Sequence, residues 1–206
     1  MNAPALIPQY LPHLGAALVL ASIVLTLGRR WTHRSEILTG LFVVTLLASL
    51  LPLAEFSLTH YARVLTGDIS VAGMIWLSAI NLAALRRPGI RVRTPIDRVI
   101  AMTLVVVSLI LYPTALGFSP FDLYAFGYSP VALPIVLVCL FGVCVWFEKW
   151  LPALMLVAAY ATWYFHCLDS DNLWDYLLDP VIVIYAVSIL VIEWRRQRPQ
   201  SANDST

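Results

Sequence analysis

Long runs of apolar residues, separated by short polar segments, dominate the pattern along this chain. A helix rises about 1.5 Å per residue, so roughly 20 mainly apolar residues cross the hydrocarbon core of a bilayer. Seven runs approach this length, at about residues 10–28, 36–53, 69–85, 96–114, 130–147, 151–166 and 177–194. The pattern therefore predicts an all-α fold, with residues 1–198 forming a single bundle of seven transmembrane helices and 199–206 forming a disordered polar tail.

The composition agrees with a membrane protein. Apolar residues make up 60% of the chain and charged residues only 12%, whereas a soluble domain usually has about 25% charged residues. Such a chain lacks the polar material to cover a water-facing surface, so lipid must be its main solvent. The formal net charge of +1 and the lack of a basic surface pattern argue against nucleic acid as a partner.

The positive charges predict the orientation in the membrane. Twelve of the 13 Lys and Arg residues fall in alternate polar segments, at 29–34, 86–98, 148–149 and 195–198, and only Arg63 falls in the opposite set. Cytoplasmic loops carry the excess of Lys and Arg, so we expect the N-terminus outside and the C-terminus in the cytoplasm. An odd number of spans requires the same arrangement. The short loops and the arginine bias are typical of a bacterial inner membrane protein.

The interiors of the predicted spans are apolar. Ionisable side chains are missing from their middle sections, and Asn81 is the most polar central residue. Ionisable groups inside a membrane mark proton and ion pathways, so this pattern disfavours a transporter. A single Asn usually forms a hydrogen bond with a neighbouring helix, and we expect this of Asn81. Asp179-Pro180 and Ser129-Pro130 are typical helix starts.

The acids and histidines gather on the predicted outer side. Seven of the 12 acids and three of the four histidines lie there, together with many aromatic residues. Aromatic rings commonly form a belt at the membrane interface. The polar residues among them make the outer face the place to look for function.

The second polar segment, residues 55–68, predicts a short interfacial helix. It would present His60 and Arg63 on one face, because residues three apart on a helix are neighbours. One hypothesis is that Arg63 holds a phosphate or carboxylate headgroup, with His60 as its acid/base partner. The alternative is that Arg63 pairs with a loop acid and that Asp68 only caps the third span.

The segment 116–130 is rich in aromatic, Gly and Pro residues, and Asp122 is its only charge. We expect a re-entrant or surface-lying lid packed by its own rings. It could line a lipid or sugar pocket, or equally form an interfacial plug. With this lid, the candidate catalytic residues are His60, Arg63, Asp68 and Asp122.

The last outer segment, residues 166–180, has the highest charge density in the chain. His166 and Asp169 are spaced as two ligands on one helical turn would be, and Asp171 is close by. His and carboxylate ligands suit a divalent metal, so these three residues are candidate metal ligands. The alternative is that the acids only keep the loop solvated. The cysteines Cys139, Cys144 and Cys167 are read as small apolar residues.

Three functions fit these patterns. The first is a non-catalytic subunit or scaffold of a lipid or polysaccharide envelope process at the periplasmic face, with membrane lipid and a membrane protein as partners. The alternative is a membrane enzyme that acts on a lipid-linked or phospholipid-headgroup substrate at the outer leaflet. The second alternative is a transporter, which the dry interior disfavours. The sequence does not decide whether the chain is an enzyme.

Overall fold

The chain folds almost entirely into helices, which confirms the predicted all-α class. A computed structural model describes residues 6–53, 56–87 and 95–197. The predicted tail, residues 199–206, lies outside these ranges. The elements in order are α1 (Leu6–Gly28), α2 (Ser35–Leu50), β1 (Pro52–Leu53), β2 (Phe56–Ser57), α3 (Leu58–Thr66), α4 (Val71–Arg86), α5 (Pro95–Ala115), the 3-10 helix η2 (Tyr124–Tyr128), α6 (Ala132–Trp146), α7 (Trp150–Tyr164), α8 (Trp174–Leu177) and α9 (Pro180–Gln197).

Each predicted span coincides with one long helix, but the helices differ in length. Two of the described helices, α1 over Tyr10–Gly28 and α5 over Pro95–Ala115, are long and apolar enough to cross a membrane. A third qualifies if α3 and α4, bent by 120°, count as one broken span. Helices α2, α4, α6 and α7 have only 15 or 16 residues. They rise about 23 Å each, which is less than the roughly 30 Å of a hydrocarbon core.

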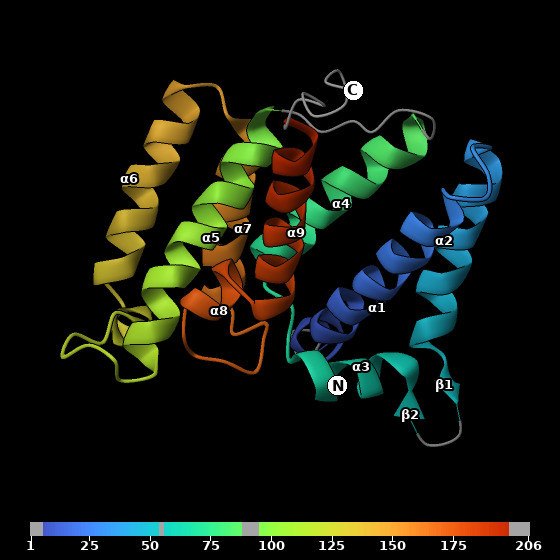
Figure 1. The fold of residues 1–206 in the computed structure, drawn as a ribbon. Coiled ribbons are helices and arrows are strands. Elements are labelled where there is room, and N and C mark those ends of the chain that lie inside the picture. The colour runs from blue at the N-terminus through green and yellow to red at the C-terminus, as the bar shows by residue number, and fades with distance from the viewer. Residues whose placement is uncertain (1–5, 54–55, 88–94, 198–206) are drawn as a thin grey trace, which may run out of the picture.

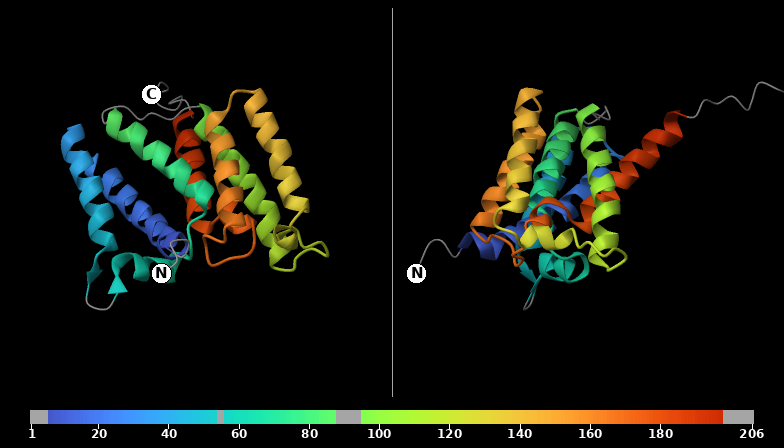
Figure 2. Two further views of the ribbon diagram at one scale, coloured as in Figure 1. Left: turned by 180° about the vertical axis from the view of Figure 1, so that it is seen from behind. Right: turned by 90° about the vertical axis from the view of Figure 1, so that its left-hand side faces the viewer.

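The two ends of the bundle carry different polar segments of the sequence (Figure 1 and Figure 2). The turn from α1 to α2, the turn from α6 to α7 and the C-terminal end of α9 lie at one end, which we call the basic end. Helix α3, η2 and α8 lie at the other, which we call the acidic end. The N-terminal end of α1 is at the acidic end, opposite the C-terminal end of α9.

Helix α4 is the centre of the packing. It contacts α1 and α7, while α6 packs on α7, α5 on α9 and α2 on α1. Trp76 of α4 is completely buried, and its indole Nε1 donates to Oδ1 of Asp97 in α5 at 3.1 Å. The amide Nδ2 of Asn81 donates to Oγ of Ser22 in α1 at 2.6 Å. The prediction that Asn81 bonds to a neighbouring helix is therefore confirmed, and α4 is tied by polar contacts to two others.

A buried carboxylate fixes the start of α4 against the start of α9. The Ser70 side chain caps α4 by accepting from the backbone N–H of Gly73 at 3.1 Å. Asp179 accepts from the N–H and hydroxyl of Ser70 at 2.9 and 2.6 Å, and from the N–H of Ile182 at 2.9 Å. The predicted cap of Asp179 on the last helix is confirmed. The same side chain also joins two helices that are distant in sequence.

Two stretches differ from the predicted helices because proline ends the helical pattern. The second helix ends at Leu50, and Pro52 and Leu53 instead pair antiparallel with Ser57 and Phe56. Proline has no N–H for a helical hydrogen bond. At the other end of the chain α8 stops at Leu177 and α9 begins anew at Pro180, so the last long helix begins three residues after the predicted start at 177.

Candidate functional site

Helix α3 lies across the acidic end of the bundle and turns sharply into α4 (Figure 1). It ends at Gly67, whose φ of +71° suits glycine because a side chain would be strained there. The N–H of Gly67 donates to the carbonyl of Arg63 at 2.8 Å. This turn brings Asp68 back beside Arg63, five residues earlier.

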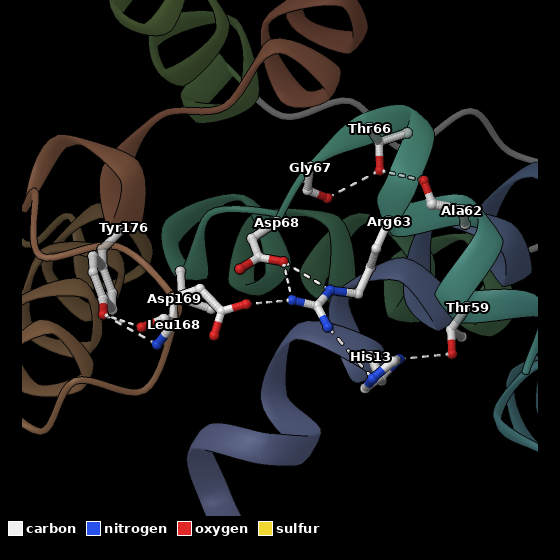
Figure 3. Close-up of polar contacts among 10 residues, drawn as sticks. All are labelled: His13, Thr59, Ala62, Arg63, Thr66, Gly67, Asp68, Leu168, Asp169 and Tyr176. Atoms are coloured by element: carbon white, nitrogen blue, oxygen red, sulfur yellow. Dashed lines mark hydrogen bonds and ion pairs between the residues drawn. The ribbon is translucent and has the colours of Figure 1, made fainter. Parts of the chain in front are cut away.

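Arg63 is the centre of a polar cluster (Figure 3). Its Nε and Nη2 both lie 2.8 Å from Oδ1 of Asp68, and Nη2 also donates to Oδ2 of Asp169 at 2.8 Å. The side chains of Arg63 and Asp68 are about four-fifths buried, whereas that of Asp169 is 81% exposed. Arg63, Asp68, Asp169 and His13 form what we call the Arg63 cluster.

His13 adds a contact from α1. Its Nε2 lies 3.4 Å from Nη1 of Arg63, and its Nδ1 lies 3.0 Å from Oγ1 of the buried Thr59. A guanidinium group can only donate, so Nε2 is the acceptor and Nδ1 carries the proton that Thr59 accepts. The hydroxyl of Thr59 then reaches Oγ of Ser57 at 2.7 Å. Sequence reasoning did not make His13 a site residue, although an ionisable residue at the edge of an apolar run is itself a signal.

His60 lies beside the cluster, as its spacing from Arg63 predicts. Its ring stacks on Phe56, with centroids 4.5 Å apart, and lies 6.3 Å from the ring of His13. His60, Arg63 and Asp68, with Val64 and Gly67, line a shallow pocket of about 430 Å³. Three of the four candidate catalytic residues therefore meet at one pocket.

The pairing of Arg63 follows the simpler of the two hypotheses for this segment. Arg63 pairs with two loop acids, Asp68 and Asp169. The predicted cap of Asp68 on the third span is wrong, because Ser70 provides that cap. Asp68 is turned towards Arg63 instead, where opposite charge holds it.

The three predicted metal ligands do not share one position. Asp169 contacts Arg63, while His166 Nδ1 lies 3.2 Å from Oδ1 of Asp171 on the exposed surface. The backbone of His166 has a φ of +50°, so the chain leaves the helix there and His166 and Asp169 are not on one turn. Within residues 6–53, 56–87 and 95–197, no group of three or more His, Cys, Asp or Glu side chains is placed to hold a metal ion. A divalent-metal site stays a prediction.

Asp122, the fourth catalytic candidate, has a local structural contact. Its Oδ1 accepts from the backbone N–H of Tyr124 at 2.9 Å and of Ala125 at 3.2 Å, at the start of η2. Two rings of this lid do pack on each other, as predicted: Tyr124 and Tyr128 meet edge to face with centroids 5.9 Å apart. Phe118 and Phe121 at its tip are exposed instead. The segment also packs against a different loop.

Residues 122–129 interlock with residues 167–179, and we call these two segments the loop pair. The fully buried Asn172 donates from Nδ2 to the carbonyl of Tyr124 at 3.0 Å and accepts at Oδ1 from the N–H of Trp174 at 2.9 Å. The N–H of Leu173 donates to the carbonyl of Gly127 at 2.9 Å. A Cβ atom at Gly127 would overlap the Asn172 side chain, so only glycine permits this approach.

Asp175 completes the loop pair. It accepts from the hydroxyl of Tyr124 at 2.9 and 3.0 Å and from the hydroxyl of Ser170 at 2.5 Å. Burial and the neighbouring Asp175 carboxylate raise the pKa of the Tyr124 phenol above its usual value. Tyr124 therefore remains a donor throughout the physiological pH range. The loop pair is a closed, mutually bonded unit, unlike the pocket at the Arg63 cluster.

Comparison with known proteins gives no further guide. No family model matches the chain, and neither a curated protein nor a solved structure matches it. The function must therefore be inferred from the geometry of the acidic end.

Proposed function

We propose that this chain is a multi-pass inner-membrane protein whose seven long helices cross the bilayer, with the acidic end outside. In this role it is a non-catalytic subunit or scaffold of an envelope process. The distribution of 12 of 13 Lys and Arg residues over alternate segments supports the orientation. The N-terminal end of α1 and the C-terminal end of α9 lie at opposite ends of the bundle, as an odd number of spans requires, which is consistent with the proposal.

The short helices are compatible with this proposal if the bilayer adapts. A hydrophobic segment shorter than the membrane is accommodated by local thinning and by flanking residues that reach the interface, at a modest cost per ångström. Trp146 and Trp150, exposed beside the turn from α6 to α7, are residues that prefer this interfacial depth.

The observation that carries the scaffold proposal is the cross-bracing of the acidic end. The Arg63 cluster joins α1, α3 and the loop after α7. The positive charge of Arg63 is thereby paired with carboxylates of the same chain. The loop pair joins two further loops through Asn172 and Asp175. The result is an outer face tied together by side-chain contacts, next to which Phe118 and Phe121 are exposed. Exposed aromatic side chains are typical of protein contacts.

The pocket beside His60 favours one alternative, a membrane enzyme that acts on a lipid headgroup. His60 would act as general acid or base there, with Arg63 holding an anion. Proton transfer by a positioned side chain contributes roughly 10²- to 10⁴-fold to a rate, so the two proposals differ strongly in what they require of His60.

The test is complementation of a deletion strain, with the envelope lipids profiled. The scaffold proposal expects H60Q to restore the deletion phenotype fully, and F118S/F121S not to restore it although the protein reaches the membrane at wild-type abundance. The enzyme alternative expects the reverse, with H60Q lowering turnover by roughly 100-fold and an unprocessed lipid accumulating. Full complementation by F118S/F121S would contradict the scaffold proposal.

A further inference from the structure

The surface of α3 indicates the depth at which it lies. Tyr61, Val64 and Leu65 are exposed on this helix, and the adjoining face carries His60 and Arg63. Helix α3 also lies across the end of the bundle instead of along it (Figure 1). A helix with these features lies in the membrane interface, with its apolar face at the boundary between headgroups and acyl chains. The adjoining pocket is then at headgroup depth.

Arg63, which lines this pocket, keeps bonding capacity. A guanidinium group has five N–H donors. Three of them form hydrogen bonds with Asp68, Asp169 and His13, and Nη2 also forms an ion pair with Asp68. One N–H on Nη1 has no acceptor among the described residues, and the other donates to His13 over a long 3.4 Å. Nη1 is therefore the atom available to a phosphate oxygen, which bonds strongly to a guanidinium group.

The charges around Arg63 select among phosphate-containing groups. One positive and two negative side chains leave one negative charge in excess. A purely anionic headgroup or free phosphate would be repelled by this excess. A zwitterion avoids the repulsion because it brings its own positive charge. Asp169 suits that charge, because its side chain is 81% exposed and only its Oδ2 contacts Arg63.

We propose that the pocket at the Arg63 cluster binds the headgroup of a zwitterionic phospholipid with a primary ammonium group. The phosphate accepts from Nη1 of Arg63, and the ammonium group donates to Asp169. The acyl chains lie along the exposed side of α3 at Val64 and Leu65. This inference rests on the proposed membrane placement, with the acidic end in the outer leaflet.

The test is lipid binding by the purified full-length chain in detergent. Short-chain phosphatidylethanolamine and short-chain phosphatidylglycerol are titrated separately, and binding is measured by native mass spectrometry. The two lipids share the phosphate and acyl chains and differ in the ammonium group. We expect phosphatidylethanolamine to bind roughly tenfold more tightly, as one charge-assisted hydrogen bond provides. Equal binding, or preference for phosphatidylglycerol, would overturn the proposal.

Two matched variants locate the effect. D169N removes the negative charge that receives the ammonium group, and we expect the fold to be retained because this side chain is exposed. D171N removes a charge from an equally exposed acid, 80% accessible, that pairs with His166 instead of Arg63. We expect D169N to abolish the lipid preference and D171N to retain it. If both variants behave alike, Asp169 does not bind the ammonium group.

Soluble glycerophosphoethanolamine distinguishes a membrane lipid from a free headgroup. It carries the same phosphodiester and ammonium charges but no acyl chains, so it cannot use the apolar side of α3. We expect it to bind at least roughly 100-fold more weakly than the lipid, and equal affinity would overturn the assignment to lipid.

The membrane placement is tested separately with C-terminal reporter fusions. A C-terminal green fluorescent protein should be fluorescent and a C-terminal alkaline phosphatase inactive if the C-terminus is cytoplasmic. If this orientation holds and the lipid preference is missing, only the headgroup inference fails. If the orientation is reversed, the proposed function fails with it.

Discussion

Two regions at the acidic end are built in opposite ways. The loop pair is closed mainly by backbone groups and the buried Asn172 amide, with the Asp175 carboxylate accepting from hydroxyl groups, and Gly127 lets the two segments approach closely. The Arg63 cluster is open and charged, with a pocket beside it and an exposed Asp169 at its edge. The first arrangement is expected to stabilise the fold, and the second leaves atoms available to a ligand.

The difference shows that a high density of acids does not by itself mark a binding site. Two of the four acids in the last outer segment serve structure: Asp175 receives the Tyr124 hydroxyl and Asp179 caps α9. Asp169 differs because its partner, Arg63, comes from a distant element and its own surface remains open. An exposed carboxylate that keeps an acceptor atom available is a more informative signal of a binding site than the number of acids in a segment.

The strongest way to test this contrast is G127A. The added Cβ overlaps Asn172, so we expect a loss of roughly 2–3 kcal/mol of stability, from overpacking and disturbed hydrogen bonds. For a chain of this size that corresponds to a fall in Tm of about 6–10 °C, measured by thermal unfolding in detergent. G142A is the control, since a Cβ there meets no atom within 4 Å. A Tm unchanged in G127A would show that the loops are not tightly interlocked.

A smaller effect is expected from Y124F, which removes the hydroxyl that donates to Asp175. The loss should be about 1 kcal/mol, or about 3 °C in Tm. Because the folded-state pKa of Tyr124 is raised, its contribution is complete below the unfolded pKa of about 10 and declines as the pH rises beyond it. The Tm difference between wild type and Y124F should therefore be constant from pH 6 to 9 and shrink above pH 10.

Y164F is the matched control for this prediction. Tyr164 is exposed and its ring contacts Phe165. Removal of its hydroxyl group should therefore leave both the Tm and the pH dependence of the Tm at wild-type values. A Y124F variant that is as stable as Y164F would mean that the Asp175 contact contributes nothing.

The smallest effect on stability is expected from D169N. The carboxylate of this ion pair is exposed and Arg63 keeps Asp68 as a partner, so the loss should be about 0.5 kcal/mol, within the range for exposed pairs. The Tm should change by under about 2 °C, and the change should disappear in 1 M NaCl because salt screens exposed charges. The defect of G127A should persist in the same salt. A large, salt-independent loss in D169N would contradict the distinction between the two regions.

The positions of the helices could be predicted because apolar runs are strong, local signals. Each of the seven predicted spans contains one long helix, and the interfacial segment contains α3. Whether all of these helices cross a membrane does not follow from the pattern, since helices as short as the 15 residues of α6 and α7 fall below the usual length of a span.

The candidate site could be predicted only in part. His60 and Arg63 share a face because helical periodicity is local, and the pairing of Arg63 with a loop acid follows from charge. The partnership of Arg63 with Asp169 spans 106 residues and that with His13 spans 50. Such contacts depend on how helices pack, which the order of residues does not reveal. The role of Asn172 was missed for the same reason, because its partner Tyr124 lies 48 residues away.

The sequence distance within the Arg63 cluster also sets an order of events during synthesis. In the proposed orientation Arg63 must be translocated to the outside, against the usual preference of arginine. Of its two carboxylate partners only Asp68, five residues later, is available at that stage, because Asp169 follows 106 residues behind. The second ion pair can therefore close only after α7 has been made. The ion pair between Arg63 and Asp169 would then be present in a fully inserted chain and absent from a partly inserted one.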